Sequence, residues 1–444
     1  MTEPPIRVGL VEGAAAVRLR LEGRFSVDGG GPAGPGDCLV ARDGDAVVLT
    51  GAGQARGAAL RLRPAELETG RVTVHDVTIG KDFHWQRRQS QSFEGTLHCA
   101  AVERGLTVVN ELPLERYLAS VISSEMRASS PTELLRSHAI VSRSWLLAQL
   151  AGPEPAAPSP APPTPPAAEV RRWYDRESHA AFDVCADDHC QRYQGTTRAF
   201  TPAVFEAVRT TRGLVLVHGG EVCDARYSKC CGGITEVFPT AWGDRDVPYL
   251  RAVYDGTGPL PGFDRLAAAP EDAERWIRSS PPAFCRRSEP EFLARVLPGF
   301  DQETRDFYRW EVACSQSELG EVLAARLGRD LGRVAALEPL ARGPSGRIHR
   351  LRIRAEGGTL VIGKELEIRR ALSRSHLLSS AFVARGEGED GEKFPRGFRL
   401  SGAGWGHGVG LCQIGAASLA DAGAGYERIL GHYFAGTVLR RLYA

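Results

Sequence analysis

Hydrophobic and polar residues alternate over much of residues 1–92, as they do along strands with one buried face. Val17, Leu19 and Leu21 show this period of two, and glycine- and proline-rich breaks separate such stretches. A second pair of alternating runs, within residues 93–112, is joined by a short polar turn and predicts a β-hairpin. We therefore expect a β-rich N-terminal region followed by a strand pair.

The hydrophobic spacing then changes to that of helices. Apolar residues recur at helical intervals in 113–122, after a proline that suits a helix start. A second helix is expected to start at 130–133, where Ser-Pro-Thr-Glu offers a capping box, and to reach about Leu150. The short connection 123–127 then carries Glu125 between two packed helices, as a polar side chain on a fixed frame.

The rest of the chain mixes both kinds of pattern. Residues 151–169 are rich in proline and alanine and read as a solvated surface loop. A helix is expected over 202–211 and a hairpin over 214–227, while 256–395 predicts an accessory insertion of helices and strands. The tail, 396–444, is glycine-dense and then helical. These patterns predict an α+β fold with antiparallel strands and packed helices.

The overall composition argues against a nucleic-acid-binding protein and against a protein that spans the membrane. Of the 444 residues, 43% are hydrophobic and 25% are charged, as in ordinary globular proteins. The 55 basic and 54 acidic residues nearly cancel, and no basic run stands out, so we expect no nucleic-acid partner. No stretch has the roughly 18 apolar residues of a membrane span. The first residues also lack the features of a secretory signal, so the sequence itself does not indicate an export route.

A cluster of metal-ligand residue types lies at 179–190. His179, Cys185 and Cys190 offer an imidazole and two thiolates, which suit tetrahedral zinc. The fourth position is open to water or to a nearby side chain from Asp183, Asp187, Asp188 and His189. A disulfide between Cys185 and Cys190 in an exported protein is the alternative.

Glu125 and Arg143 are candidates for chemistry in the helical region. In an apolar cleft, the pKa of a carboxyl such as Glu125 would rise, and the group could protonate a leaving glycosidic oxygen and later take a proton back. Arg143, on the second helix, could orient that acid or hold an acetyl or carboxylate group of a sugar. The alternatives are a solvated loop glutamate and a helix-surface cation.

Two further stretches combine functional residues with glycines. Tyr227 and Lys229 fall on one face of a strand that ends in two glycines, where the backbone can approach a ligand. In the run GWGHGVG, glycines surround Trp405 and His407, and the absence of a lysine-serine ending disfavours a phosphate loop. A tight loop with Trp405 stacked on a sugar is the better interpretation.

The cysteines outside the metal cluster leave several possibilities open. Ten cysteines in a chain of this length are too sparse for a disulfide scaffold. Cys230, Cys231 and Cys412 could form a disulfide, bind a metal or serve a thiol-dependent enzyme, although plain burial is the commoner fate of such residues.

Several motifs, in order, resemble the stage II sporulation protein D and amidase-enhancer family of peptidoglycan lytic transglycosylases. They are NELPLERYLASVISSEM, then ELLRSHAIVSRSWLL, then AVRTTRGLVLVHGG, and finally GWGHGVGLCQIGA with GYERILGHYFAGTVL. The resemblance implies a catalytic core formed by 93–255 and 396–444, with 1–92 and 256–395 as additions. Cysteines at 230, 231 and 412 depart from the hydroxyl residues that are common in the family.

The resemblance also implies roles for the candidate residues. Glu125 corresponds to the catalytic acid and Arg143 to a helix arginine. Tyr227 and Lys229 correspond to cleft positions, and His179, Cys185 and Cys190 to structural zinc ligands.

The implied activity is the cutting of peptidoglycan glycan strands to 1,6-anhydro-N-acetylmuramic acid ends, in cell-wall remodelling or sporulation, at the cell envelope or outside the cell. The alternative is a non-catalytic, wall-binding enhancer of an N-acetylmuramoyl-L-alanine amidase.

Overall fold

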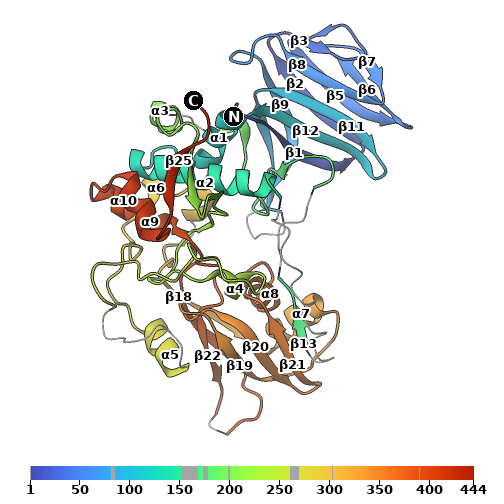
Figure 1. Ribbon diagram of the computed structural model, residues 1–444. Coiled ribbons are helices and arrows are strands. Elements are labelled where there is room, and N and C mark those ends of the chain that lie inside the picture. The colour runs from blue at the N-terminus through green and yellow to red at the C-terminus, as the bar shows by residue number, and fades with distance from the viewer. Residues whose placement is uncertain are drawn as a thin grey trace. The chain divides into compact units, whose positions relative to one another are not determined.

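A computed structural model of the chain describes residues 2–81, 86–152, 169–173, 179–198, 201–260, 270–302, 304–389 and 391–444 (Figure 1). Helices and mostly antiparallel sheets are both present, so the fold belongs to the α+β class, as the sequence predicted. The chain divides into two compact units. Unit 1 comprises 1–143, 176–214 and 441–444, and unit 2 comprises 144–175 and 215–440. Most of the predicted proline-rich loop lies outside the described residues.

Unit 1 contains two sheets within its described residues. The first runs in the order β14 (Val184–Cys185), β1 (Pro5–Ala14), β12 (Gly105–Pro113), β11 (Thr96–Val102), β8 (Ala59–Pro64), β3 (Phe25–Val27) and β4 (Pro32–Ala33). The second runs β10 (Arg87–Phe93), β9 (Arg71–Ile79), β2 (Ala16–Glu22), β5 (Gly36–Asp43), β6 (Ala46–Gly51) and β7 (Ala55–Gly57). Strands β11 and β12 of the first sheet contact β6 and β5 of the second. The N-terminal region is thus a β-sandwich.

The alternating sequence pattern explains this sandwich. Along β2, the side chains of Val17, Leu19 and Leu21 are buried and their neighbours are exposed. Burying one face of each sheet removes apolar surface from water at about 25 cal/mol per Å2. The predicted hairpin is confirmed, because β11 and β12 pair antiparallel with Val102 opposite Gly105.

Helices α1 (Leu114–Glu125), α2 (Thr132–Leu150) and α3 (Pro202–Thr210), with the short η1 (Gly195–Thr197), follow the sandwich. Helix α1 packs against α3, and the unit boundary falls within α2 after Arg143. One prediction needs correction here. Glu125 is the last residue of α1 and not part of the loop, because the apolar spacing of α1 continues until Met126 turns to an extended conformation.

Unit 2 contains a four-stranded and a three-stranded antiparallel-rich sheet in its described part. They run β13 (Glu169–Arg171), β21 (Gly358–Gly363), β20 (Ile348–Ala355), β19 (Val334–Arg342), and β18 (Arg309–Ser315), β23 (Gly397–Ala403), β22 (Phe382–Glu387). One apolar core includes residues from both sheets, among them Leu351, Ile353, Phe398 and Leu400. Strand β23 pairs with both β18 and β22, so this sheet joins the predicted insertion 256–395 to the tail.

The remaining elements of unit 2 are short. The helices are α4 (Phe238–Ala241), α5 (Pro270–Arg278), α6 (Pro290–Val296), η2 (Gly299–Gln302), α7 (Gln316–Leu327), α8 (Glu365–Ala371), α9 (Gln413–Asp421) and α10 (Tyr426–Tyr433). The strands are β15 (Leu214–His218), β16 (Glu221–Val222), β17 (Tyr227–Ser228), β24 (Leu411–Cys412) and β25 (Val438–Arg441). Parallel pairing of β17 with β24 places Ser228 opposite Cys412. No helix in the described ranges is long and apolar enough to cross a membrane.

Candidate functional site

Glu125 lies at the C-terminal end of α1, where its side chain is nearly buried at 8% exposure. Its Oε1 accepts a hydrogen bond of 3.1 Å from the backbone N–H of Arg192. A buried carboxyl needs such a donor, because leaving a buried polar group unpaired is costly. The segment around Arg192 therefore helps to fix the orientation of Glu125.

The segment 191–194 is itself tied to α1. The Tyr117 hydroxyl donates to Oε1 of Gln191 over 3.0 Å, and the backbone N–H of Gln194 donates to Oγ of Ser120 over 3.2 Å. Tyr117 and Ser120 lie within α1, which ends at Glu125. These bonds hold one face of α1 against 191–194.

Tyr193 anchors the same segment in the core. Its ring stacks on Phe93 and Tyr117 at centroid distances of 5.7 and 5.3 Å, and its hydroxyl donates to Oδ1 of Asn110 over 2.5 Å. Stacked aromatic pairs contribute about 0.5–1.5 kcal/mol beyond their buried area. The backbone donor to Glu125 therefore sits next to a rigid anchor.

Arg143 occupies a different environment from the one that the sequence suggested. Its side chain is fully buried, and its Nε and Nη2 donate to the two carboxylate oxygens of Glu115 over 3.0 and 2.5 Å. A third bond, of 2.9 Å, runs from Nη1 to the backbone oxygen of Leu214. Glu115 also accepts from the Tyr443 hydroxyl over 2.7 Å. This packing favours a structural role for Arg143 over a substrate contact.

The predicted metal ligands meet in unit 1. His179, Cys185, His189 and Cys190 each place a ligand atom within 4.8 Å of the others. Nε2 of His179 lies 3.4 Å from Sγ of Cys190, and Nδ1 of His189 lies 3.5 Å from the same sulfur. Two thiolates and two imidazoles are a donor set that zinc takes in tetrahedral sites. The cluster can therefore hold a metal ion.

His189 is the fourth group that sequence reasoning left open. Asp183 and Asp187 already accept backbone N–H bonds, from Arg7 over 2.8 Å and from Lys81 over 2.8 Å respectively. Asp188 pairs with the side chain of Arg192. His189, in contrast, directs Nδ1 toward both cysteine sulfurs, at 3.9 Å from Cys185 and 3.5 Å from Cys190. The position of His189 next to Cys190 in the sequence was the only signal that could have identified it as the fourth ligand.

Fold and electrostatics both prepare this cluster. Cys185 lies in β14, which pairs in parallel with β1 and places Gly9 beside it. A hydrogen bond from Cys190, opposed by burial and assisted by His189, lowers the pKa of the Cys185 thiol to about 3. Burial raises the pKa of Asp188 to about 7, with Arg192 opposing and Glu125 adding to the rise. A thiolate at Cys185 is the form that binds metals.

In unit 2, Lys229 is nearly buried and forms an ion pair with Asp301, with 2.8 Å between Nζ and Oδ2. Sequence reasoning missed Asp301, because it lies in η2, far along the chain. Tyr227 precedes Lys229 in β17, which covers only Tyr227–Ser228 and is shorter than the strand expected from the sequence. A substrate group that reaches Lys229 must compete with Asp301.

The glycine loop of unit 2 holds Trp405 and His407. Trp405 stacks on the buried Phe307 with ring centroids 4.9 Å apart, so one face of the indole is already covered. Burial, with the charges of nearby arginines, holds the pKa of His407 well below its usual range. Nδ1 of this neutral ring accepts from the backbone N–H of Val409 over 3.0 Å, so Nε2 carries the proton. His407 thus stabilises the loop.

The candidate residues divide between the units. Glu125, Arg143 and the His/Cys cluster belong to unit 1, and Tyr227, Lys229, Trp405 and His407 belong to unit 2. The cleft positions that the resemblance implies for Tyr227 and Lys229 stay a prediction.

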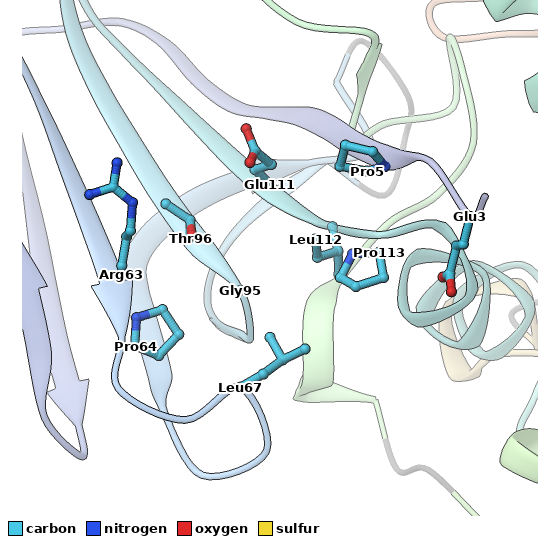
Figure 2. Close-up of a pocket in the computed structure, with 10 residues that line it drawn as sticks. All are labelled: Glu3, Pro5, Arg63, Pro64, Leu67, Gly95, Thr96, Glu111, Leu112 and Pro113. Carbon is cyan, nitrogen blue, oxygen red and sulfur yellow. The ribbon is translucent and has the colours of Figure 1, made fainter.

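Figure 2 shows a pocket of unit 1 at the ends of β8 and β12. Its lining includes Glu3, Arg63 and Glu111 among apolar residues and prolines. None of the predicted site residues lines this pocket.

Comparisons with known proteins agree with the motifs. Residues 102–218 match the family model described as "Stage II sporulation protein", and residues 236–410 match "Domain of unknown function (DUF8618)". The second match covers the whole of the predicted insertion, 256–395. The match over residues 102–218 and the similarity to proteins of these names support the stage II sporulation protein D and amidase-enhancer family, which the sequence motifs indicated.

Individual relatives are distant. The amidase enhancer of Bacillus subtilis (strain 168) is 26% identical over 234 residues, which cover 53% of this chain and 32% of that protein. Stage II sporulation protein D of Bacillus amyloliquefaciens is 24% identical over 332 residues, 74% of each chain. An uncharacterized protein of Brachyspira hyodysenteriae is 25% identical over 349 residues, 78% of this chain and 71% of that protein. The chain thus spans about a third of the amidase enhancer that it matches.

Proposed function

We propose that the protein cleaves peptidoglycan glycan strands by lytic transglycosylation, with Glu125 as the catalytic acid and base. The observation that carries the proposal is the placement of Glu125, nearly buried at the end of α1 and oriented by the Arg192 N–H. A positioned carboxyl with restricted solvent contact suits proton transfer to a glycosidic oxygen. The family's stage II sporulation and amidase-enhancer names support a role in the cell wall or in sporulation.

The reaction needs one carboxyl. Glu125 donates its proton to the oxygen that bridges N-acetylmuramic acid to the next sugar, and that glycosidic bond breaks. The carboxylate then accepts the proton of the muramic acid 6-hydroxyl. The oxygen of that hydroxyl bonds to C1 of the same sugar, which gives the 1,6-anhydro ring. No water enters the product, in contrast to hydrolysis by a carboxyl pair.

The His/Cys cluster serves this site as a brace. Zinc, when bound, would hold the segment that starts at His179 and ends at Cys190, two residues before the N–H donor to Glu125. Structural zinc with four protein ligands leaves no open position for a nucleophilic water. The cluster therefore acts on Glu125 through the backbone of Arg192, whose N–H donates to the Glu125 carboxylate.

The second candidate function is that of an enhancer, which binds the wall and stimulates an N-acetylmuramoyl-L-alanine amidase. The similarity to a protein named amidase enhancer favours it. Both functions place the protein at the cell envelope or outside the cell, with glycan strands as its ligand. They differ in whether the carboxyl of Glu125 is needed.

The two candidates are separated by incubating glycan strands that lack stem peptides with wild type, Glu125→Gln and Glu133→Gln. Glu133 lies in the first turn of α2, where its partly buried carboxylate forms an ion pair with Arg136. The same change of Glu to Gln at this position is therefore a matched control. The proposal expects anhydro-ended fragments from wild type and Glu133→Gln alone. Strand binding without fragments from folded wild type, together with amidase stimulation by Glu125→Gln, would establish the enhancer instead.

A further inference from the structure

Unit 2 contains a second group of metal-ligand side chains, distinct from the His/Cys cluster. Cys231, Asp255, Cys285 and Cys412 place their ligand atoms within 4.8 Å of one another. All four side chains are buried, with exposures of 2%, 0%, 0% and 0% respectively. They come from four separate segments of the chain. Cys231 follows β17, Asp255 precedes α5, Cys285 precedes α6, and Cys412 ends β24 before α9. We call these residues the Cys3Asp cluster.

The distances within the Cys3Asp cluster match a tetrahedral site. With Zn–S bonds near 2.3 Å and Zn–O bonds near 2.1 Å, ligand atoms at tetrahedral corners are separated by ~3.8 Å for two sulfurs and ~3.6 Å for sulfur and oxygen. Sγ of Cys231 lies 3.6 Å from Sγ of Cys285 and 3.4 Å from Oδ2 of Asp255. These two distances are close to the spacing that one zinc ion requires.

Surrounding groups hold the ligands in place. Oδ1 of Asp255 accepts from the Tyr433 hydroxyl over 2.7 Å, and Nε2 of His432 lies 3.7 Å from the same oxygen. The backbone N–H of Cys231 donates to Sγ of Cys412 over 3.2 Å. Such outer contacts orient carboxylate and thiolate ligands in metal sites.

Backbone packing and charge also suit a buried anionic site. Helix α9 passes close to Asp255 at Gly415, where a Cβ atom would lie 2.5 Å from Oδ2. Three thiolates and a carboxylate around Zn2+ leave a net negative charge, which needs cations nearby. Nη1 of Arg347 donates to the backbone oxygen of Cys231 over 3.1 Å, and Nη1 of Arg309 donates to that of Gly232 over 2.9 Å.

We propose that Cys231, Asp255, Cys285 and Cys412 form a closed structural site for a divalent cation of borderline softness, zinc being the one that fits. The bound ion cross-links four segments of unit 2 that span residues 231–412 in sequence. Burial of the sulfurs disfavours a nucleophilic thiol, because reactive cysteines are partly exposed. A disulfide, in contrast, would join only two of the three sulfurs. The third thiol and the buried carboxyl of Asp255 would then lack the metal ion that all four side chains would otherwise share.

Cys230 provides an internal control. It is fully buried, and its thiol hydrogen-bonds with Cys285 and Cys412, yet it is outside the proposed ligand set. Cys223 is a second buried cysteine of unit 2, with no place in the Cys3Asp cluster.

The experiment uses the full chain with Cys185→Ser and Cys190→Ser, which removes the first cluster. After reduction and loading with Zn2+ or Co2+, the site predicts one metal per chain by elemental analysis and a thiolate-to-cobalt charge-transfer band. X-ray absorption of the zinc form is expected to show three sulfur ligands and one oxygen. Adding Cys285→Ser and Cys412→Ser should abolish both signals, whereas adding Cys223→Ser or Cys230→Ser should keep them.

Several results would overturn the site. They are a folded chain without stoichiometric metal, a zinc shell without sulfur, or loss of metal in the Cys230→Ser chain. A mass that is lower by two hydrogens before reduction, which shows a disulfide, would also overturn it. The absorption measurement needs no change in the Cys3Asp cluster, so it decides the matter even where Cys285→Ser and Cys412→Ser prevent folding.

Discussion

Replacement of Arg143 by methionine tests whether this arginine is structural. Methionine keeps much of the length of the side chain and removes its charge and its N–H donors. Among the residues that the structure describes, the carboxylate of Glu115 then keeps the donors from Tyr443 and from the backbone of Gly213, at 2.7 and 3.2 Å. The change leaves the charge of a carboxylate whose side chain is 8% exposed without its counter-ion.

The size of the effect follows from that burial. Removing one partner of a buried ion pair costs about 3–5 kcal/mol. For a cooperative unit of roughly 150–250 residues, each kcal/mol lowers Tm by about 2–4 °C, so Tm should fall by roughly 6–20 °C. Adding Glu115→Gln removes the stranded charge and should recover part of the loss.

Calorimetry and urea unfolding of wild type, Arg143→Met and the double variant measure these changes. Arg136→Ala is the control, because Arg136 lies on the same helix and pairs with Glu133 at side-chain exposures of 26% and 27%. Such a pair contributes about 0–1 kcal/mol. If Arg143→Met unfolds like wild type but binds glycan strands less well, the structural role is refuted and the substrate contact that the sequence suggested is restored.

Three further predictions concern other parts of the chain. In the metal-free protein, the pKa of Cys185 is lowered to about 3, so its thiolate should react with iodoacetamide at about pH 6, where an ordinary thiol is protonated. The buried Cys99, whose pKa is raised to about 12, should stay unmodified and serves as the control. Bound Zn2+ should protect Cys185 from the reagent. Because the pKa of Cys185 is lowered, the thiolate's contribution to stability should be present above about pH 8.5 and be lost as the pH falls toward about 3. Tyr193→Phe leaves Oδ1 of the buried Asn110 without its donor and should cost about 1–3 kcal/mol by urea unfolding. Ser315→Ala removes the capping box of α7 and should cost about 1 kcal/mol in the unfolding of unit 2.

Local patterns were sufficient for most of the fold. The period of two along β2, the hairpin of β11 and β12, and the amphipathic α1 each depend on neighbours in sequence, which is why hydrophobic spacing predicted them. The end of α1 was placed too early, because nothing local to Glu125 stops the helix. The pairing of β23 with β18 and β22 depends on contacts between distant segments, which spacing does not encode.

The candidate site divides along the same line. Cys185 and Cys190 were readable as metal ligands because all the members of their cluster lie within twelve residues. The partners of Arg143 and Lys229 were not readable, because Glu115 and Asp301 lie far from them in sequence. Asp255 and Cys285 were not predicted as metal ligands for the same reason, because each lies far along the chain from the other members of its cluster.

The most direct test of the proposed function follows the oxygen that becomes bonded to C1 of N-acetylmuramic acid at the newly formed end. Glycan strands are cleaved in water enriched in 18O, and the fragments are analysed by mass spectrometry. Because the attacking oxygen is the sugar's own 6-hydroxyl, the account predicts 1,6-anhydro ends without 18O from wild type and no fragments from Glu125→Gln. Incorporation of one 18O atom at the new ends, or equal cleavage by Glu125→Gln, would contradict it.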